Sequence, residues 1–374
     1  MKTLIIARSI PSDKYKMQGI FEFDQALALA QKTNNEVVYI AFDLRSIRRW
    51  RRWGIRKYTR SGIDVIEVNL PLGQFPDSMI DKIAIKNLRR LLRQVMNDYR
   101  IDIIHAHFIE NGFYLVKATE NESIPKILTE HRSDMNTKCL SDRFKYLGDN
   151  TYKNLNQVIS VSKTLATSIY KNFHIKSEVI PNIVDLENFR YIECADRTNN
   201  VVSVGNLRRE KNFRVLIESF AKAFKDKRKL IIIGEGEEKE SLMRQAEMLG
   251  ISDRVIFKGV LSRNAIAKIM DECSFFALAS DSETFGVAYI EALAKGLPVV
   301  ATKCGGPEDF VNERNGIMVQ CNDSDLFATG LKMLDRDIGS YDRRKISEEI
   351  TTKFSGAHVA QTLEKLYYKI IEKE

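Results

Sequence analysis

The strongest structural signal in this chain is the stretch Ser280-Asp-Ser-Glu-Thr-Phe-Gly-Val-Ala-Tyr-Ile-Glu-Ala-Leu-Ala-Lys-Gly-Leu-Pro-Val-Val-Ala-Thr-Lys-Cys-Gly-Gly306. Its apolar positions Val287 and Ile290 follow helical spacing, and the glycine and proline at 296 and 298 end the helix. The apolar run 299–302 then predicts a buried strand. A loop therefore leads into a helix and the helix into a strand, which is the alternation of an α/β fold.

Two glutamates flank the start of this predicted helix. Glu283 lies in the loop and Glu291 lies eight residues later, about two turns into the helix, so both carboxylates can face one ligand. Phe285 and Gly286 lie where the first helical N–H groups are unpaired, and such a terminus attracts phosphate. This pattern suits a sugar nucleotide, which has hydroxyls at both ends and phosphates between them. The alternative is a surface helix with solvated glutamates, but the apolar residues around Glu291 favour a partly buried carboxylate.

Length and composition indicate a water-soluble protein of two domains. The chain has 374 residues, of which 44% are apolar and 29% charged. No apolar run approaches the roughly 18 residues of a membrane span, and the apolar run after Met1 is too short for a signal peptide, so we expect a cytoplasmic protein. The five cysteines are scattered, which predicts free thiols: Cys139, Cys194, Cys273, Cys304 and Cys321.

Positive charge is concentrated in the first half of the chain. Residues 1–190 hold 30 Lys and Arg against 21 Asp and Glu, whereas the remainder holds 28 against 29. Residues 45–58 interleave arginines with both tryptophans, a pattern that fits a segment lying on an anionic membrane surface. Nucleic-acid binding or a solvated loop are the alternatives. The residues expected at the membrane are Arg48, Arg49, Trp50, Arg51, Arg52 and Trp53.

Several polar residues of the first half follow predicted strands. Gly19 lies at a turn between strand and helix, where a ligand can approach the backbone or where the glycine simply makes the turn. His107 ends the strand 101–106, and Glu130 and His131 end the strand 126–129. The carboxyl ends of such strands hold ligands in α/β sheets, so these residues predict the floor of a cleft. No third ligand is spaced to join the histidines, so we expect no metal.

The second half restarts the alternation of strands and helices at residue 201. Arg208 and Lys211 follow the strand 201–205, where they can clamp a pyrophosphate or simply begin a surface helix. Gly234 and Gly236 follow the strand 229–233 but lack the third glycine of a dinucleotide-binding fingerprint.

These residues together resemble a known family. The stretch from Glu283 to Glu291, with the residues up to 302, resembles the signature of the GT-B-fold retaining glycosyltransferases of family 4, also called glycosyl transferases group 1. Residues 102–107, 129–131, 180–185, 204–205 with Lys211, and 233–236 match further family segments in the same order. The resemblance implies α/β architecture with two Rossmann-like doubly wound domains facing across a cleft. We expect an acceptor-binding domain at 1–185, a nucleotide-sugar domain at 199–355 and a terminal helix at 356–374 that packs back toward the first domain.

The resemblance also implies roles for individual residues. Glu291 would bind ribose hydroxyls, Glu283 the donor sugar and Lys211 the pyrophosphate, while His107 would lie beside the transferred sugar. Many members carry Arg directly after the glycine equivalent to Gly205, where this chain has Asn206, and Arg208 is our candidate for the missing charge. The residues expected at the donor are Gly19, Gly205, Arg208, Lys211, Gly234, Gly236, Glu283, Phe285, Gly286 and Glu291, with Glu130 and His131 toward the acceptor.

The family chemistry defines the function we expect. It is a metal-independent, retaining transfer of a hexosyl or N-acetylhexosaminyl unit from a nucleotide sugar, with UDP as the nucleotide common in the family. The acceptor would be a lipid-linked saccharide or a polysaccharide precursor at the cytosolic membrane face. We expect no further cofactor and no nucleic-acid partner. A sugar-nucleotide epimerase of the same fold and a non-catalytic partner subunit are the alternatives.

Overall fold

The computed structural model describes residues 1–15, 18–45, 48, 50–136, 140–193 and 197–373. The chain divides into two compact units. Unit 1 holds Met1–Ile183 together with Gly356–Glu374, and unit 2 holds Val184–Ser355. Among the described residues, no helix combines the length and apolar character needed to cross a lipid bilayer.

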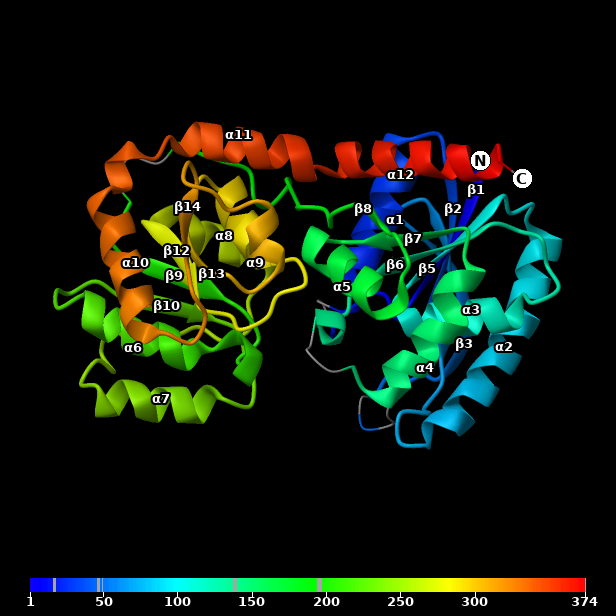
Figure 1. The fold of residues 1–374 in the computed structure, drawn as a ribbon, viewed down its shortest axis with the longest axis horizontal. Helices are drawn as coiled ribbons and strands as arrows, with labels where there is room; N and C mark the ends of the chain where they lie inside the picture. The colour runs from blue at the N-terminus through cyan, green and yellow to red at the C-terminus, as the bar shows by residue number, and fades with distance from the viewer. Residues whose placement is uncertain (16–17, 46–47, 49, 137–139, 194–196, 374) are drawn as a thin grey trace. The chain divides into compact units, whose positions relative to one another are not determined.

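Unit 1 contains an eight-stranded sheet (Figure 1). Its order is β3-β4-β2-β1-β5-β6-β7-β8, and every neighbouring pair is parallel except β3 with β4. Because the chain moves outward from β1 in both directions, the carboxyl ends of β1 and β5 form the switch point at which such sheets bind ligands. The strands are β1 (Lys2–Ala7), β2 (Glu36–Asp43), β3 (Gly54–Arg60), β4 (Ile63–Asn69), β5 (Ile103–His107), β6 (Lys126–Glu130), β7 (Gln157–Ser160) and β8 (Glu178–Val179).

Helices cover both faces of this sheet, as right-handed crossovers in opposite directions require. Helices α1 (Ile20–Lys32) and α12 (Gly356–Ile371) pack against each other and bury an apolar cluster with the strands, so the last helix of the chain completes the core of unit 1. Helix α3 packs against α2 and α4. The other helical segments are α2 (Asp77–Asp98), α3 (Ile109–Ala118), η1 (Ser133–Asn136), α4 (Asp142–Thr151), η2 (Tyr152–Asn154) and α5 (Lys163–Phe173).

Unit 2 is built on a six-stranded parallel sheet in the order β11-β10-β9-β12-β13-β14. Counted within the unit this is the 3-2-1-4-5-6 order of a dinucleotide-binding fold, with its switch point between β9 and β12. The strands are β9 (Val201–Val204), β10 (Leu230–Ile233), β11 (Val255–Phe257), β12 (Phe275–Leu278), β13 (Val299–Thr302) and β14 (Gly316–Val319). The helical segments are η3 (Arg209–Lys211), α6 (Phe213–Ala223), α7 (Lys239–Met248), α8 (Arg263–Glu272), α9 (Val287–Ala294), η4 (Gly306–Asp309), α10 (Ser324–Arg336), η5 (Ile338–Ser340) and α11 (Arg343–Phe354).

The structure confirms the predicted α/β class with two doubly wound units. The helix and strand predicted from residues 280–306 are α9 and β13. The hairpin of β3 and β4 was missed, because β3 is an edge strand whose residues alternate between exposed and half-buried and whose polar composition hides the period of two. By contacts the chain divides after Ile183 and after Ser355, whereas the sequence prediction ends the first domain at 185, begins the second at 199 and begins the terminal helix at 356.

Candidate active site

In unit 2 the residues expected at the donor converge on the switch point of the sheet. Lys211 ends η3 after β9, and Glu283 lies in the loop after β12. Lys211 Nζ lies 2.6 Å from Glu283 Oε1, and Ser280 Oγ donates to the same oxygen at 2.9 Å. Glu283 is only 6% exposed, so this ion pair is largely shielded from water. The fold thus joins two residues that lie 72 positions apart in the sequence.

The loop that carries Glu283 is fixed by its backbone. The N–H of Glu283 donates to the carbonyl of Cys304 at 2.9 Å, and the N–H of Gly306 donates to the carbonyl of Glu283 at 2.8 Å. A Cβ at Gly306 would lie 2.4 Å from the Cα of Phe285, so only glycine allows this close approach. The ring of Phe285 packs against Phe310 in turn. The carboxylate is therefore held on a rigid support, as a binding site requires.

Helix α9 begins directly after this loop. Gly286, at φ 93°, is its N-cap and supplies no side-chain acceptor, so the first N–H groups of the helix are free of a side-chain cap. Tyr289 is buried and its hydroxyl donates to the carbonyl of Leu278 at 2.6 Å, which ties α9 to the end of β12. Glu291 is buried on the same helix, as the apolar sequence around it predicts. Two carboxylates and a helix start thus occupy one edge of the sheet.

The predicted glycines of unit 2 have a packing role of their own. A Cβ at Gly234 would lie 1.9 Å from the carbonyl oxygen of Gly205, and a Cβ at Gly236 would lie 2.3 Å from that of Leu207. The loops after β9 and β10 therefore touch, which accounts for both glycines without a ligand. Arg208 is exposed and makes no ion pair with any residue that the structure describes, so its charge is available at the edge where Lys211 lies.

In unit 1 aromatic rings form a column at the ends of β5 and β6. The imidazoles of His105 and His107 stack with centroids 4.5 Å apart, and those of His107 and His131 stack at 5.2 Å. His107 Nδ1 lies 2.9 Å from His131 Nε2, so one ring donates a hydrogen bond to the other. Phe108 packs on His131, with centroids at 4.8 Å. The predicted residues His107 and His131 are thus in direct contact.

Burial controls the charge of this column. It lowers the pKa of His107 to about 3, with a smaller contribution from the positive charge of Arg8, and it lowers the pKa of His131 well below its usual range. Both rings are therefore neutral at pH 7. Burial raises the pKa of Glu130 to about 7, although its carboxylate accepts N–H groups of His131 and Arg132. Glu130 is fully buried and shapes the turn after β6, so it lies behind the surface of the predicted cleft floor.

Gly19 lies beside the switch point of unit 1. Its φ is 70°, and a Cβ there would lie 2.3 Å from the carbonyl oxygen of Ser9, so the turn before α1 is pressed against the loop after β1. Glycine is required for this turn whether or not a ligand binds.

Three residues at or behind these sites were not found by sequence reasoning: Arg8, Phe108 and Tyr367. Arg8 places its guanidinium 3.2 Å from the ring centroid of Phe108. Tyr367 of α12 contacts His105 through its hydroxyl, at 2.6 Å from Nδ1. None stands in a recognisable motif, and only the position of Phe108 directly after the strand that ends at His107 could have suggested a role.

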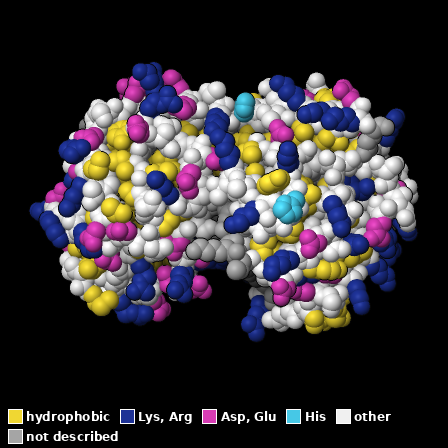
Figure 2. Space-filling model, viewed as in Figure 1, with side chains coloured by type: hydrophobic (Ala, Val, Ile, Leu, Met, Phe, Trp, Pro, Cys, Tyr) yellow, Lys and Arg dark blue, Asp and Glu magenta, His cyan; other side chains and the backbone are white. Residues whose placement is uncertain are grey.

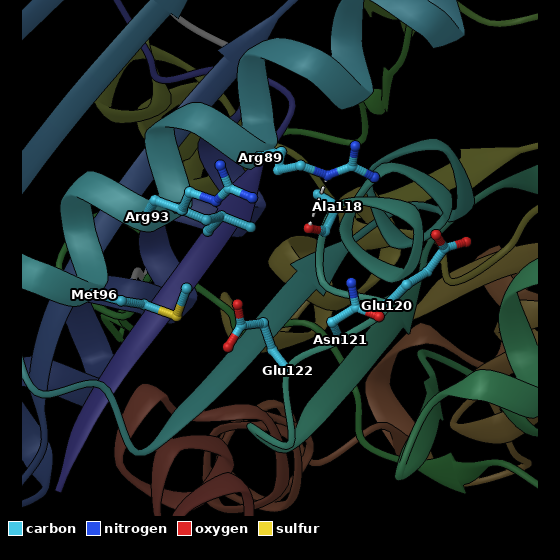
Figure 3. Close-up of a pocket in the computed structure, with 8 residues that line it drawn as sticks. Arg89, Arg93, Met96, Ala118, Glu120, Asn121 and Glu122 are labelled. Atoms are coloured by element: carbon cyan, nitrogen blue, oxygen red, sulfur yellow. Dashed lines mark hydrogen bonds between the residues drawn. The ribbon is translucent and has the colours of Figure 1, made fainter.

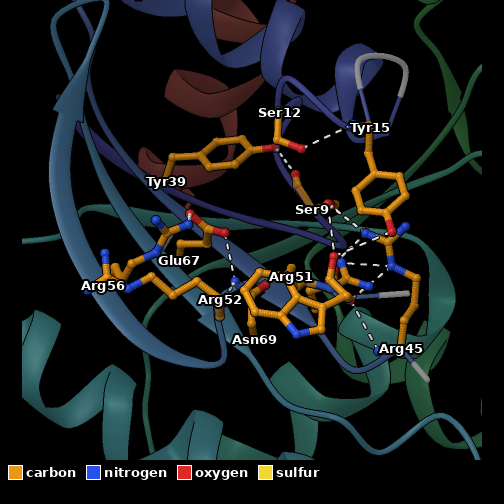
Figure 4. A network of polar contacts seen from close by, with 12 residues as sticks. Ser9, Ser12, Tyr15, Tyr39, Arg45, Arg51, Arg52, Arg56, Glu67 and Asn69 are labelled. Carbon is orange, nitrogen blue, oxygen red and sulfur yellow. Dashed lines mark hydrogen bonds and ion pairs between the residues drawn. The ribbon is translucent and has the colours of Figure 1, made fainter. Parts of the chain in front are cut away.

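The Arg and Trp segment is partly folded into unit 1 (Figure 4). Arg45 and Arg51 both pair with the buried carboxylate of Asp43, and the side chain of Arg51 is only 10% exposed. This corrects the expectation for Arg51, whose charge is held by Asp43 and does not face a surface. Trp50 is 63% exposed and Arg52 is exposed, whereas Arg49 lies outside the described residues.

A hollow of about 280 Å³ in unit 1 lies away from these residues. It is lined by the second half of α2 and the segment after α3, as Figure 3 shows. Arg89 there donates to the carbonyl oxygen of Lys117 at 2.6 Å and so caps the end of α3. Because α3 ends at the edge of the sheet opposite to its ligand-binding edge, this hollow is not part of the candidate site.

Two further features of the described residues concern metal ions and nucleic acids. Within the described ranges, no group of three or more His, Cys, Asp or Glu is placed to hold a metal ion. On the face drawn in Figure 2, Lys and Arg side chains are dispersed among Asp and Glu and do not form the basic stripe typical of nucleic-acid-binding proteins. Cys273, Cys304 and Cys321 are free thiols, while Cys139 and Cys194 lie outside the described residues.

Two doubly wound units, the second with a lysine and two carboxylates at its switch point, define the GT-B class of glycosyltransferases. The model described as Glycosyltransferase Family 4 matches residues 26–188, and the model described as Glycosyl transferases group 1 matches residues 186–351. An uncharacterized glycosyltransferase of Haemophilus influenzae is 30% identical over 256 residues, which cover 67% of this chain and 70% of that protein. The chain belongs to this family of glycosyltransferases, and the predicted family and enzyme class are confirmed.

One named relative is an N-acetylgalactosamine-N,N'-diacetylbacillosaminyl-diphospho-undecaprenol 4-alpha-N-acetylgalactosaminyltransferase of Campylobacter jejuni. It is 32% identical over 201 residues, and the match covers 52% of this chain and 54% of the relative, or about half of its length. Among solved structures, sucrose-phosphate synthase from Thermosynechococcus elongatus matches with a TM-score of 0.80 and 17% identity over 100% of both chains. Anabaena HepE in complex with UDP-glucose matches with a TM-score of 0.73 and 20% identity, covering 99% of this chain and 100% of that one. These two likenesses confirm the fold.

Proposed function

We propose that this protein transfers a hexosyl or N-acetylhexosaminyl unit from a UDP-sugar to a lipid-linked or polysaccharide-precursor acceptor with retention of anomeric configuration. The observation that carries the proposal is the pair of Lys211 and Glu283 beside the uncapped start of α9. A UDP-sugar donor is supported by the similar Anabaena protein, whose structure was solved in complex with UDP-glucose. A lipid-linked acceptor is supported by the name of the Campylobacter relative, which contains diphospho-undecaprenol.

The ion pair indicates how the donor would be bound. A diphosphate at this edge would compete with Glu283 for the ammonium of Lys211, because phosphate offers several charged oxygens to the same donor. Glu283 Oε1 would then be released to accept hydroxyls of the sugar, and Glu291 would accept those of the ribose. The N–H groups at the start of α9 would take phosphate oxygens. Lys211 and Glu283 would thus each exchange the partner that they have within the protein for one on the donor.

Positive groups at the diphosphate would make a metal unnecessary. Lys211, the helix start and Arg208 place positive charge where the leaving diphosphate develops negative charge, and such electrostatic stabilisation is usually the largest catalytic contribution. We therefore expect activity to persist in EDTA. Loss of activity on chelation that Mg²⁺ restores would refute metal independence.

In unit 1 we assign His107 to the transferred sugar. Because the imidazole of His107 is neutral, its Nε2 can exchange a single hydrogen bond with a sugar hydroxyl without adding positive charge beside an oxocarbenium-like transition state. For retention we propose same-face attack, with the leaving diphosphate accepting the acceptor's proton. His131 would orient His107 through the hydrogen bond between their rings.

For the acceptor we propose contact with the cytosolic face of an anionic membrane. Trp50 and Arg52 are exposed and suit the headgroup level, where each basic residue contributes about 1 kcal/mol. Arg48 and Trp53 stay in this proposal, whereas Arg51 is excluded by its pairing with Asp43. Replacing Arg48 and Arg52 by Ser should weaken sedimentation with phosphatidylglycerol vesicles. Unchanged sedimentation would remove the membrane from the proposal.

The donor site is tested by nucleotide binding. We would measure the thermal stability of the full chain with UDP, GDP and ADP and with their common sugar conjugates. We expect UDP and a UDP-sugar to raise the melting temperature, and Glu291→Ala, Lys211→Met and Arg208→Ala each to reduce that increase. Lys345→Met is a matched control, because this exposed lysine pairs with Asp342 at 3.1 Å on the surface of the same unit. Stabilisation by another base alone would refute UDP, and an unchanged response of Arg208→Ala would remove Arg208 from the site.

A further inference from the structure

At the switch point of unit 1 lies an arginine that forms no ion pair with a carboxylate of any residue that the structure describes. Arg8 follows β1 directly and is exposed. In the parallel register Ile6 pairs with Ala106, so Arg8 lies beside Phe108, on whose ring its guanidinium rests. Among the described residues no carboxylate comes within ion-pair distance of Arg8, although the charges of Glu22 and Glu110 act on it. The five donors of this guanidinium are therefore available to a ligand.

The two carboxylates near Arg8, those of Glu22 and Glu110, do not form an ion pair with its guanidinium. Glu110 pairs with Arg132 at 2.6 Å. Glu22 is buried, and burial raises its pKa, which favours the uncharged form. The described residues thus include no carboxylate in direct ion-pair contact with the guanidinium of Arg8.

A helix start faces the same edge. Helix α3 has ten residues and begins directly after Phe108, which provides no side-chain cap. Phe108 itself has a φ of 68° and a ψ of 144°, a positive-φ conformation that is rare outside glycine and that clusters at functional sites. The first N–H groups of α3 and the guanidinium of Arg8 are therefore both donors at the end of adjacent strands β1 and β5.

Buried polar atoms without partners provide an independent sign of a ligand. His107 is fully buried, its Nδ1 is used by His131, and its Nε2 on the opposite side of the ring has no hydrogen-bond partner in the part of the chain that the structure describes. In the tautomer where His131 donates to His107, this Nε2 carries the proton and is a donor. Asn111, in the first turn of α3, likewise has a buried Nδ2 without a partner. A buried polar atom without a hydrogen-bond partner lowers the stability of the fold unless a ligand or a water molecule bonds to it.

We propose that Arg8, the first turn of α3 and Asn111 Nδ2 in that turn form a subsite for a phosphate group of the acceptor, next to His107, whose Nε2 is left to the transferred sugar. Guanidinium and helix N–H groups together are the donors that bind phosphate elsewhere in proteins. This inference rests on the proposed function, in which unit 1 binds the acceptor and Lys211 of unit 2 holds the donor diphosphate. It identifies the acceptor chemically as a phosphorylated or diphosphate-linked saccharide, and it places the phosphate beside the residue assigned to the transferred sugar.

The test uses inorganic phosphate and histidine signals. The full chain contains five histidines, of which His107 borders the proposed subsite and His131 is hydrogen-bonded to His107. We would label histidine with ¹⁵N and titrate inorganic phosphate, first alone and then with UDP saturating. We expect saturable shifts of the His107 and His131 signals in both series, and at least a tenfold weaker phosphate affinity in Arg8→Gln. Because Arg8 is exposed, this variant should fold.

Arg60→Gln is the matched control. Arg60 also rests on an aromatic ring of unit 1, 4.9 Å from the centroid of Phe23, but it donates to the carbonyl of Pro11 at 2.6 Å. It should keep the phosphate response of the wild type. If the response is absent, or is the same in Arg8→Gln, the subsite is refuted. If bound UDP abolishes the response, the group bound there is the donor diphosphate, and the acceptor assignment is wrong.

Failure of this test is distinguishable from failure of the proposed function. The thermal stabilisation by UDP and its loss in Glu291→Ala depend on unit 2 and do not require phosphate binding at Arg8. A chain that binds UDP but shows no phosphate response keeps its proposed donor site and loses only the subsite.

Discussion

Replacing His107 by Asn should remove a large part of the acid sensitivity of unit 1. Folded His107 stays neutral because burial lowers its pKa to about 3, whereas in the unfolded chain it gains a proton as the pH falls below about 6.5. The unfolded state therefore binds more protons in this range, and stability is lost as the pH falls from 6.5 toward 3. At 1.36 kcal/mol for each pH unit, the full effect is about 5 kcal/mol.

A practical pH range samples part of this effect. Between pH 7.5 and 5 only the unfolded chain titrates, and the contribution of His107 to the free energy of unfolding falls by about 2 kcal/mol. His105 and His131 act in the same direction, since their pKa values are also lowered by burial. The wild type should therefore lose more than 2 kcal/mol from this column of rings, and His107→Asn should lose about 2 kcal/mol less than the wild type.

The assay is urea unfolding followed by tryptophan fluorescence at pH 7.5, 6 and 5. Both tryptophans of the chain, Trp50 and Trp53, lie in unit 1, so the signal follows the unit that contains His107. Ile127→Val is the control, because it removes a buried methylene beside His105 without a titrating group and should lower stability by a similar amount at every pH. If His107→Asn keeps the pH dependence of the wild type, the imidazole is not held neutral and the argument from burial is wrong.

Three further predictions concern other buried groups. Burial raises the pKa of Glu130 to about 7, so the folded state keeps a proton that the unfolded state releases above about 4.5. The contribution of Glu130 to stability should therefore fall by up to about 3 kcal/mol as the pH rises from 4.5 to 7, opposite to the histidines, and Glu130→Gln should steepen the rise in stability between pH 5 and 7.5 in the same urea series. Lys295 is buried and pairs with Asp271 at 2.8 Å, so Lys295→Met should cost about 3–5 kcal/mol, measured by calorimetry, and a change below about 0.5 kcal/mol would contradict the pairing. Gly234→Ala would place a Cβ 1.9 Å from the carbonyl oxygen of Gly205, so the variant should be recovered in poor yield or with a lower melting temperature. Unchanged stability would show that the loops after β9 and β10 can separate freely.

The parts that the sequence predicted are those determined by local patterns. Helix α9 and strand β13 follow from apolar spacing and from the glycine and proline between them, and the burial of Glu291 follows from the apolar residues around it. The strand that ends at His107 was recognised for the same reason. Spacing along one element is enough to place a residue on a face or at a strand end.

Contacts between distant segments could not be predicted from such local patterns. The pairing of Lys211 with Glu283 depends on the order of β9 and β12 in the sheet, which no local period encodes. The Arg and Trp segment was interpreted from its composition as a surface element. In the structure Arg51 pairs with Asp43 of β2, and its side chain is largely buried. A buried acidic partner at the end of another strand cannot be deduced from the basic segment alone.

The C-terminal helix shows how far such a contact can reach. Tyr367 lies 262 residues after His105, yet its hydroxyl lies 2.6 Å from His105 Nδ1, and His105 Nε2 lies 2.7 Å from Thr129 Oγ1. Both nitrogens of His105 are thus used, which fixes its ring plane, and His107 stacks on that plane at 4.5 Å. Because His107 in turn contacts His131, the orientation of the residue assigned to the transferred sugar depends on a hydroxyl supplied by the last helix of the chain. The return of α12 to unit 1 therefore completes the apolar core and also positions the candidate active site.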